Sequence, residues 1–136
     1  MLSFGTDSLQ KLNTCHADLQ TLFHEVIKYF PCKVIAGNRN KADQDKAFTE
    51  KKSKLQFPNS KHNSMPSMAA DVMPFPVDWN DTNRMRYFAG YVMGIAALLK
   101  EQGKMAFSVR YGGDWDRDTQ LKDNVFNDMV HFELVS

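Results

Sequence analysis

The stretch 60-SKHNSMPSMAADVMP-74 joins a polar loop to an apolar strand and carries the strongest fold signal in the chain. Residues 53–67 are rich in serine, asparagine and proline, a composition typical of a loop. Residues 69–73 are apolar apart from Asp71 and end at Pro74, which predicts a buried strand. A carboxylate inside such a strand is costly unless it is paired or binds a metal. We therefore expect Asp71 to hold an ion pair or a metal ion.

The C-terminal segment has the same feature, a polar side chain inside an apolar strand. Residues 129–135 alternate between an apolar face and a polar face that carries His131 and Glu133. Two shorter runs, 33–36 and 107–111, contain β-branched residues and predict further strands. The chain therefore predicts four short strands that are far apart in the sequence.

Three segments have helical periodicity. Apolar residues recur at helical spacings from 8 to 29, and Pro31 ends this helix. Residues 41–52 predict a short helix, and 82–102 predict a long one that stops at Gly103. Helices at the front and centre with strands between them predict an α+β fold, a small antiparallel sheet with helices packed around it. No linker divides the chain, so we expect a single domain over residues 1–136.

Composition bounds the class of protein. The chain has 136 residues, of which 43% are hydrophobic and 24% charged, and this excludes disorder, collagen and coiled coil. The formal net charge of +1 gives no argument for a nucleic-acid partner. Cys15 and Cys32 are too few for a disulfide scaffold and are interpreted as free, partly buried thiols, with a single bridge between them as the alternative.

The sequence contains no recognisable targeting segment. The first ten residues lack the basic start and apolar run of a secretory signal. The most apolar stretch, 87–99, contains two glycines and is too short to span a bilayer. We therefore expect synthesis in the cytosol without stable membrane insertion, so that action outside the membrane would require release by another agent.

Two histidines and two acids can be assembled into a reactive site. His62, Asp71 and His131 would supply two imidazoles and a carboxylate, a ligand set that suits catalytic zinc and leaves one position for water. Asp128, three residues before His131, could take the proton of that water. In the alternative interpretation Asp71 pairs with Arg110 or Arg39, and His131 is a half-buried strand residue. The spacing of these residues leaves both interpretations open, whereas His16 and His24, in a predicted helix, are expected to be structural.

Five segments, in order along nearly the whole chain, resemble motifs of the zinc DD-peptidase and VanY-type peptidase family. They are His16-Ala17-Asp18-Leu19, Gly37-Asn38-Arg39 with Gln44, Ser60-Lys61-His62 with Ala69-Ala70-Asp71, Arg110-Tyr111-Gly112-Gly113-Asp114-Trp115, and Asp128-Met129-Val130-His131. The family includes D-Ala-D-Ala carboxypeptidases and dipeptidases, and also the L-alanyl-D-glutamate endopeptidases that tailed phages use as endolysins. A short chain with Asp rather than Glu before the last histidine is most similar to the phage endopeptidases.

The sequence departs from the family pattern at two places. The separation from His62 to Asp71 is nine residues, longer than is usual, and Ser67 stands where glycine is expected. Lengthening a loop by two residues costs little closure entropy, so the ligands need not be displaced. Ala17 replaces the usual proline, which is a preference for the start of a helix.

The resemblance implies a Hedgehog/DD-peptidase-like fold and one Zn²⁺ on His62, Asp71 and His131, with Asp128 as the catalytic base. Arg39 is our candidate for stabilising the oxyanion, because charge that develops on the carbonyl oxygen needs a positive group beside it. An ordinary surface salt bridge is the alternative for Arg39.

Four further residues are candidates for substrate binding, namely Ser60, Gln44, Arg110 and Trp115. Ser60 could orient a zinc histidine or contact substrate, and Gln44 could hold Arg39 or the substrate backbone, or be an exposed helix residue. Arg110, with Lys61, could receive a carboxylate of the peptide, and Trp115 could form a wall of the groove. The Gly112–Gly113 pair is expected to let the backbone approach a ligand closely.

The function that we predict is hydrolysis of the L-Ala–D-Glu bond in the peptidoglycan stem peptide by metal-activated water. The protein would be a monomeric phage endolysin that stays in the host cytoplasm until a holin opens the membrane. The first alternative is a D-Ala-D-Ala carboxypeptidase or dipeptidase of the same family, for which an export signal would be expected. The second is a non-catalytic cell-wall-binding module, which would have no reason to keep Asp128.

Overall fold

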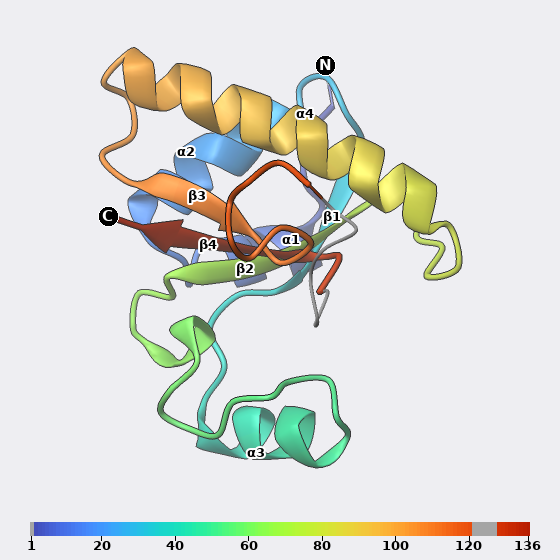
Figure 1. Ribbon diagram of the computed structural model, residues 1–136, viewed down its shortest axis with the longest axis vertical. Coiled ribbons are helices and arrows are strands. Elements are labelled where there is room, and N and C mark those ends of the chain that lie inside the picture. Colours follow the sequence, from blue (N-terminus) through green and yellow to red (C-terminus); the bar gives the residue numbers. More distant parts are fainter. Residues whose placement is uncertain (1, 121–127) are drawn as a thin grey trace.

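Four strands form one antiparallel sheet in the order β1-β2-β4-β3 (Figure 1). They are β1 (Cys32–Ala36), β2 (Ala69–Pro74), β3 (Ser108–Tyr111) and β4 (His131–Val135). The computed structural model describes residues 2–120 and 128–136. Every residue of β2 is buried, as expected for an apolar strand in the middle of a sheet. The predicted α+β fold is confirmed.

The register of the two central strands places the polar residues opposite one another. Asp71 of β2 lies directly across from His131 of β4. On the other side of β4, Glu133 lies across from Arg110 of β3. Side chains directly opposite on antiparallel strands are close enough to interact, so the register alone brings distant residues together.

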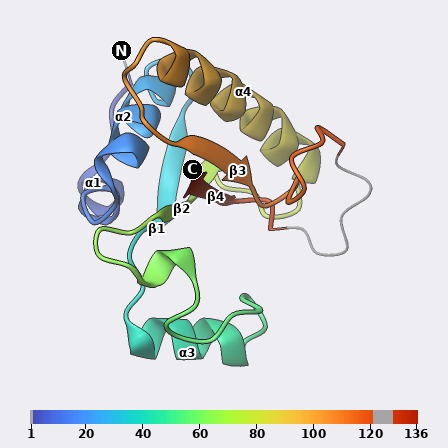
Figure 2. The same ribbon diagram turned by 60° about the vertical axis from the view of Figure 1, so that its left-hand side comes forward.

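Three helices cover one face of the sheet. The helices α1 (Thr6–Leu12), α2 (Ala17–Val26) and α4 (Thr82–Glu101) share a core with the sheet, into which β4 projects Phe132 and Leu134. The ring of Phe132 contacts Phe23 of α2 and Phe88 of α4. Another helix, α3 (Lys41–Thr49), lies on the other side of the sheet and stands away from it (Figure 2). The two sides of β4 therefore differ, with an apolar core on one and polar groups on the other.

The single helix predicted over 8–29 is wrong, because the chain makes two helices with a turn at 13–16. Two other segments, around Gly37 and around Ser67, pack against this turn. A Cβ on Gly37 would lie 2.3 Å from the carbonyl oxygen of Lys11, so only glycine fits there. The Thr14 hydroxyl accepts a hydrogen bond from the amide of Asn38, and Cys15 pairs with Ser67 as an isolated bridge. The helix is interrupted where the loops that carry the polar site dock onto it.

The other elements lie close to their predicted ranges. The helix predicted over 41–52 ends at Thr49, and the predicted loop 53–67 contains a short 3-10 turn, η1 (Lys61–Asn63). His16 caps α2 by accepting a hydrogen bond from the amide of Asp18, so its structural role is confirmed. Cys15 and Cys32 are buried free thiols, and burial raises their pKa to about 11 and about 12. Within residues 2–120 and 128–136, no helix has both the length and the apolar character to cross a membrane.

Candidate metal centre and catalytic cleft

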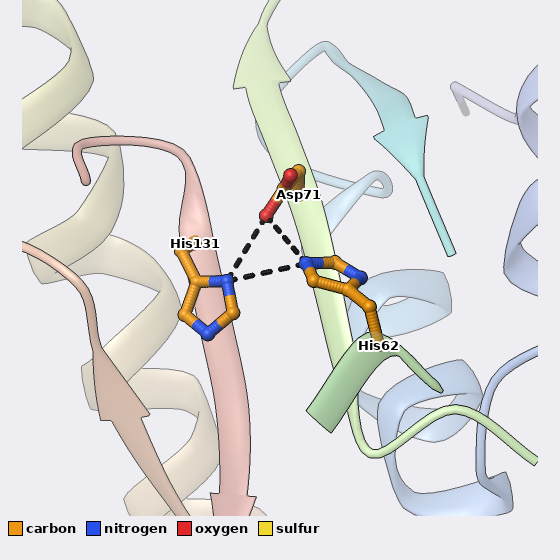
Figure 3. A group of neighbouring side chains, drawn as sticks. All are labelled: His62, Asp71 and His131. Atoms are coloured by element: carbon orange, nitrogen blue, oxygen red, sulfur yellow. Dashed lines mark hydrogen bonds and ion pairs between the residues drawn. The ribbon is translucent and has the colours of Figure 1, made fainter. Parts of the chain in front are cut away.

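His62 of η1, Asp71 of β2 and His131 of β4 point toward one another (Figure 3). The Nε2 atom of His62 lies 3.1 Å from Oδ1 of Asp71 and 3.2 Å from Nδ1 of His131. The third side of this triangle, from His131 Nδ1 to Asp71 Oδ1, is 3.2 Å. All three residues are buried. The structure thus brings together the three residues that were predicted to be metal ligands.

The geometry of this triad fits a small dication. With bonds of about 2.0–2.1 Å and tetrahedral angles, the ligand atoms of zinc lie about 3.3 Å apart, close to the separations in the triad. The ring nitrogen of each histidine that faces away from the triad also has a hydrogen-bond acceptor, as is usual for metal-binding histidines. His62 Nδ1 is 2.7 Å from the carbonyl oxygen of Gly37, and His131 Nε2 is 2.8 Å from Oε1 of Glu133. The donor set and its orientation therefore suit a metal ion.

Local polar contacts hold His62 in place. The Ser60 hydroxyl caps the turn by accepting from the His62 amide, and Asn63 completes a capping box with the Ser60 amide. The carbonyl oxygen of His62 accepts from the Arg39 amide at 2.8 Å and from the Asn38 side chain at 3.2 Å. Ser60 therefore orients the backbone that carries His62, and it also lines the cleft.

Asp71 has two partners at the same time. Its Oδ1 atom faces the two imidazoles, and its Oδ2 atom receives a hydrogen bond of 2.8 Å from the Arg39 guanidinium. Burial opposes the charge of this carboxylate, but the adjacent imidazoles of His62 and His131 hold the pKa of Asp71 well below its usual range. The ion pair and the metal ligand, set as alternatives from the sequence, are therefore compatible. Arg110, the other predicted partner of Asp71, pairs with Glu133 instead.

The hydrogen bond between His131 and Glu133 shifts the pKa of both residues. Burial disfavours a charged imidazole, but hydrogen bonds with Asp71 and Glu133 raise the pKa of His131 to about 9. Burial likewise opposes ionisation of Glu133, but hydrogen bonds from His131 and Arg110 lower its pKa to about 2. At neutral pH a cation is thus favoured between the two carboxylates, either a proton on His131 or a metal ion in its place.

Asp128 lies beside the triad and faces the cleft. Its Oδ2 atom is 4.0 Å from Nδ1 of His131, and its side chain is 25% exposed, so water can reach it. Burial and the negative charge of Asp71 raise the pKa of Asp128. A carboxylate with a raised pKa that lines a cleft and lies beside the triad is suited to accept a proton.

Glycine at 112 allows this close arrangement. A Cβ there would lie 2.2 Å from the carbonyl oxygen of Asp128 and 3.0 Å from the Cβ of His131. At Gly113 the equivalent atom would lie 2.3 Å from the ring of Tyr111. The lack of a side chain at both glycines is therefore required by packing within the protein, and approach of a ligand to their backbone stays a prediction.

A cleft of about 400 Å³ opens over the triad, between the polar face of the sheet and the loop after α3. It is lined by Arg39, residues 52–55 and 59–62, Arg110, Trp115, Asp128, His131 and Glu133. The ring of Trp115 packs against both the His131 ring, at 5.4 Å between centroids, and the Arg110 guanidinium, at 5.6 Å. Arg110 and Trp115 therefore lie where a substrate would contact them.

Gln44 lies behind the cleft and is fully buried, so it is not an exposed helix residue. Its amide donates to Ser53 and Leu55, and its oxygen accepts from Asn63 at 3.2 Å and from Arg39 at 3.4 Å. This placement favours the predicted contact with Arg39 over contact with substrate. Arg39 itself is only 16% exposed, so its ion pair with Asp71 is not an ordinary surface salt bridge.

Glu133 is the residue of the site that the sequence interpretation did not single out. The alternation of β4 places it on the face of His131, but a charged residue two positions from a histidine is common on any half-exposed strand. Nothing in the spacing indicates that the two side chains contact each other. The hydrogen bond from His62 to the Gly37 carbonyl could not be predicted either, because every residue has a backbone carbonyl and the residue types do not indicate which one accepts.

Comparisons with known proteins agree with this geometry. The family described as phage L-alanyl-D-glutamate peptidase matches residues 1–135. The crystal structure of Serratia marcescens L-Ala D-Glu endopeptidase ChiX superposes with a TM-score of 0.70 and shares 26% sequence identity. The alignment covers 97% of this chain and 89% of that chain. No curated protein sequence matches this chain.

Proposed function

The chain belongs to the phage L-alanyl-D-glutamate peptidase family, and from this premise we propose that it hydrolyses its substrate with one zinc ion held by His62, Asp71 and His131. The protein is a peptidoglycan endopeptidase that acts on the L-Ala–D-Glu bond. The family and the superposed structure both carry this specificity, which favours it over D-Ala-D-Ala cleavage and over a binding module without activity. The convergence of three buried ligand atoms at 3.1–3.2 Å is the observation that supports the zinc ion.

Each residue of the cleft has a role in this proposal. Bound zinc would supply a Lewis acid that lowers the pKa of water and polarises the scissile carbonyl. Asp128 accepts the proton of the attacking water and passes it to the leaving amine. The positive charge of bound zinc would lower the pKa of Asp128 and so favour the ionised form of this base.

Arg39 can serve Asp71 and the substrate together. A guanidinium has five N–H donors, and the described contacts use one for Asp71 and one for Gln44. The remaining donors stabilise negative charge on the carbonyl oxygen in the cleft. Arg110 and Trp115 contact the stem peptide, whose D-glutamate offers a carboxylate to the guanidinium.

The test is mass spectrometry of muropeptides after digestion of purified sacculi, with and without a chelator. We expect new peptides that begin at D-glutamate and glycan-linked L-alanine, and both are expected to disappear on chelation and return with zinc. Release of terminal D-alanine with intact stems would overturn the assigned bond. Cleavage that persists after complete removal of metal would overturn the proposal that hydrolysis depends on zinc.

We also propose that the enzyme is a monomeric phage lysin that stays in the host cytoplasm until a holin opens the membrane. The family assignment supports this role. Bacteria that express the enzyme alone are expected to grow, whereas co-expression with a holin is expected to lyse them. Lysis at the same rate without the holin would contradict the proposed route of release.

A further inference from the structure

We infer that Glu133 is a positioning residue that selects which nitrogen of His131 binds the metal and fixes the plane of that ring. The inference rests on the zinc site proposed above and extends it to a residue outside the ligand set. Glu133 Oε1 lies 2.8 Å from Nε2 of His131, while Nδ1 of the same ring points at the triad. A carboxylate at Nε2 requires a proton there, and this leaves the lone pair of Nδ1 for a metal.

The two histidines of the triad are held by different acceptors. His62 presents its Nε2 atom to the triad and is oriented through Nδ1 by the neutral carbonyl oxygen of Gly37. His131 has the opposite orientation and is held by a full negative charge. A charged acceptor gives the stronger hydrogen bond and makes the ring a stronger electron donor. The bond from His131 to Glu133 therefore contributes more to metal binding than the bond from His62 to Gly37.

Glu133 is in turn fixed by cations from two other elements. Its Oε2 atom accepts from both Nε and Nη2 of Arg110, at 3.2 and 2.6 Å, and lies 3.7 Å from Nζ of Lys61. The Glu133 side chain is only 7% exposed, so it has little freedom to turn away. One carboxylate oxygen thus serves His131, and the other serves the cations.

The sheet register explains why this arrangement is rigid. Arg110 lies across from Glu133 on β3, just as Asp71 lies across from His131 on β2. Trp115 packs over both the Arg110 guanidinium and the His131 ring. The imidazole is therefore in contact with Asp71, Glu133 and Trp115. Removal of the carboxylate would free the His131 ring and leave two cations beside the metal.

The experiment measures zinc affinity by competition with a chromophoric chelator, using the metal-free full chain and the variants Glu133→Ala and Glu133→Gln. Removing a carboxylate that orients a metal histidine typically costs about 10–100-fold in metal affinity. We expect a decrease in that range for the alanine variant and a smaller decrease for glutamine, whose oxygen can still accept from Nε2. Glu25→Gln, in α2 on the other face of the sheet, is the matched control and is expected to equal the parent.

A second readout separates positioning from general stabilisation. Cobalt(II) in place of zinc reports ligand geometry through its visible absorption, and we expect the Glu133→Ala spectrum to differ from that of the parent. An unchanged spectrum and zinc affinity within twofold of the parent would overturn the inference, even if the metal-free variant melts at a lower temperature. The glutamine variant decides the question if the alanine variant does not fold. If the parent itself binds no zinc, the proposed metal site fails, which is a distinct outcome.

Discussion

The proposed metal site has two halves that are held by different means. Asp71 and His131 lie on neighbouring strands, and the opposite side of β4 packs into the apolar core. His62 and Arg39 come from loops outside the sheet and are held by polar contacts with Ser60, Asn63 and Gln44. The sheet half is therefore stabilised by many small apolar contacts that act together, whereas the loop half depends on a few hydrogen bonds.

This difference predicts different responses to mutation. Beneath the sheet, many neighbouring side chains share the apolar packing, whereas each buried hydrogen bond in the loop half has no substitute. The structure thus suggests that residues far from the chemistry matter more on the loop side.

Replacing a ligand in either half should have the largest effect. We expect His62→Ala and His131→Ala each to lose stoichiometric zinc and all measurable hydrolysis, because three protein ligands are needed to hold a catalytic ion. Zinc content by elemental analysis and sacculus digestion measure this. His24→Ala, an exposed helical histidine, serves as the control. Full zinc content in either variant would show that the replaced histidine is not a metal ligand.

Replacing the base should separate metal binding from chemistry. We expect Asp128→Ala to retain about one zinc per chain and to lose hydrolysis by about 100-fold or more, the usual contribution of a positioned base. Steady-state kinetics on a soluble muropeptide, with zinc content measured on the same sample, checks both. Hydrolysis at the parental rate would remove Asp128 from the assigned role.

Zinc affinity should depend on pH through the sheet half. The pKa of His131 is raised to about 9, so below that pH the metal-free protein carries a proton that zinc must displace. Zinc affinity is therefore expected to rise with pH up to about 9, and to fall by about tenfold for each pH unit below that value. Competition titrations from pH 6 to 9 measure this slope. A flat profile would show that no proton leaves on binding.

The smallest effect is expected from a buried residue of the loop half. Gln44→Ala leaves the partners of a fully buried amide unsatisfied and should destabilise the fold by about 1–3 kcal/mol. Because the Arg39 guanidinium is then held less firmly, we expect kcat/KM to fall by about tenfold while zinc is retained. Asp45→Ala, on the exposed face of α3, should change stability by less than about 0.5 kcal/mol. Equal urea midpoints for the two variants would contradict the stabilising role assigned to the buried amide of Gln44.

The alternation and periodicity of the sequence predicted much of the fold. Buried strands, the long helix α4 and the separation of His131 from the apolar face of β4 follow from local patterns, because side-chain direction repeats every two residues in a strand and every 3.6 in a helix. Two of the three residues of the triad stood out for a related reason, whereas His62 joined them through the family resemblance. Polar residues inside apolar strands are costly, so Asp71 and His131 stood out from their neighbours.

What the sequence determined by itself was therefore the direction and burial of side chains within each element, together with motifs whose residue types specify a chemistry. Only the tertiary structure decided which groups meet. Gly37 packs against Lys11 beside the turn at 13–16, and Glu133 lies opposite Arg110 in the sheet while it bonds to His131. Such contacts depend on the packing of elements that are far apart in the chain, and no local pattern encodes a distance between them.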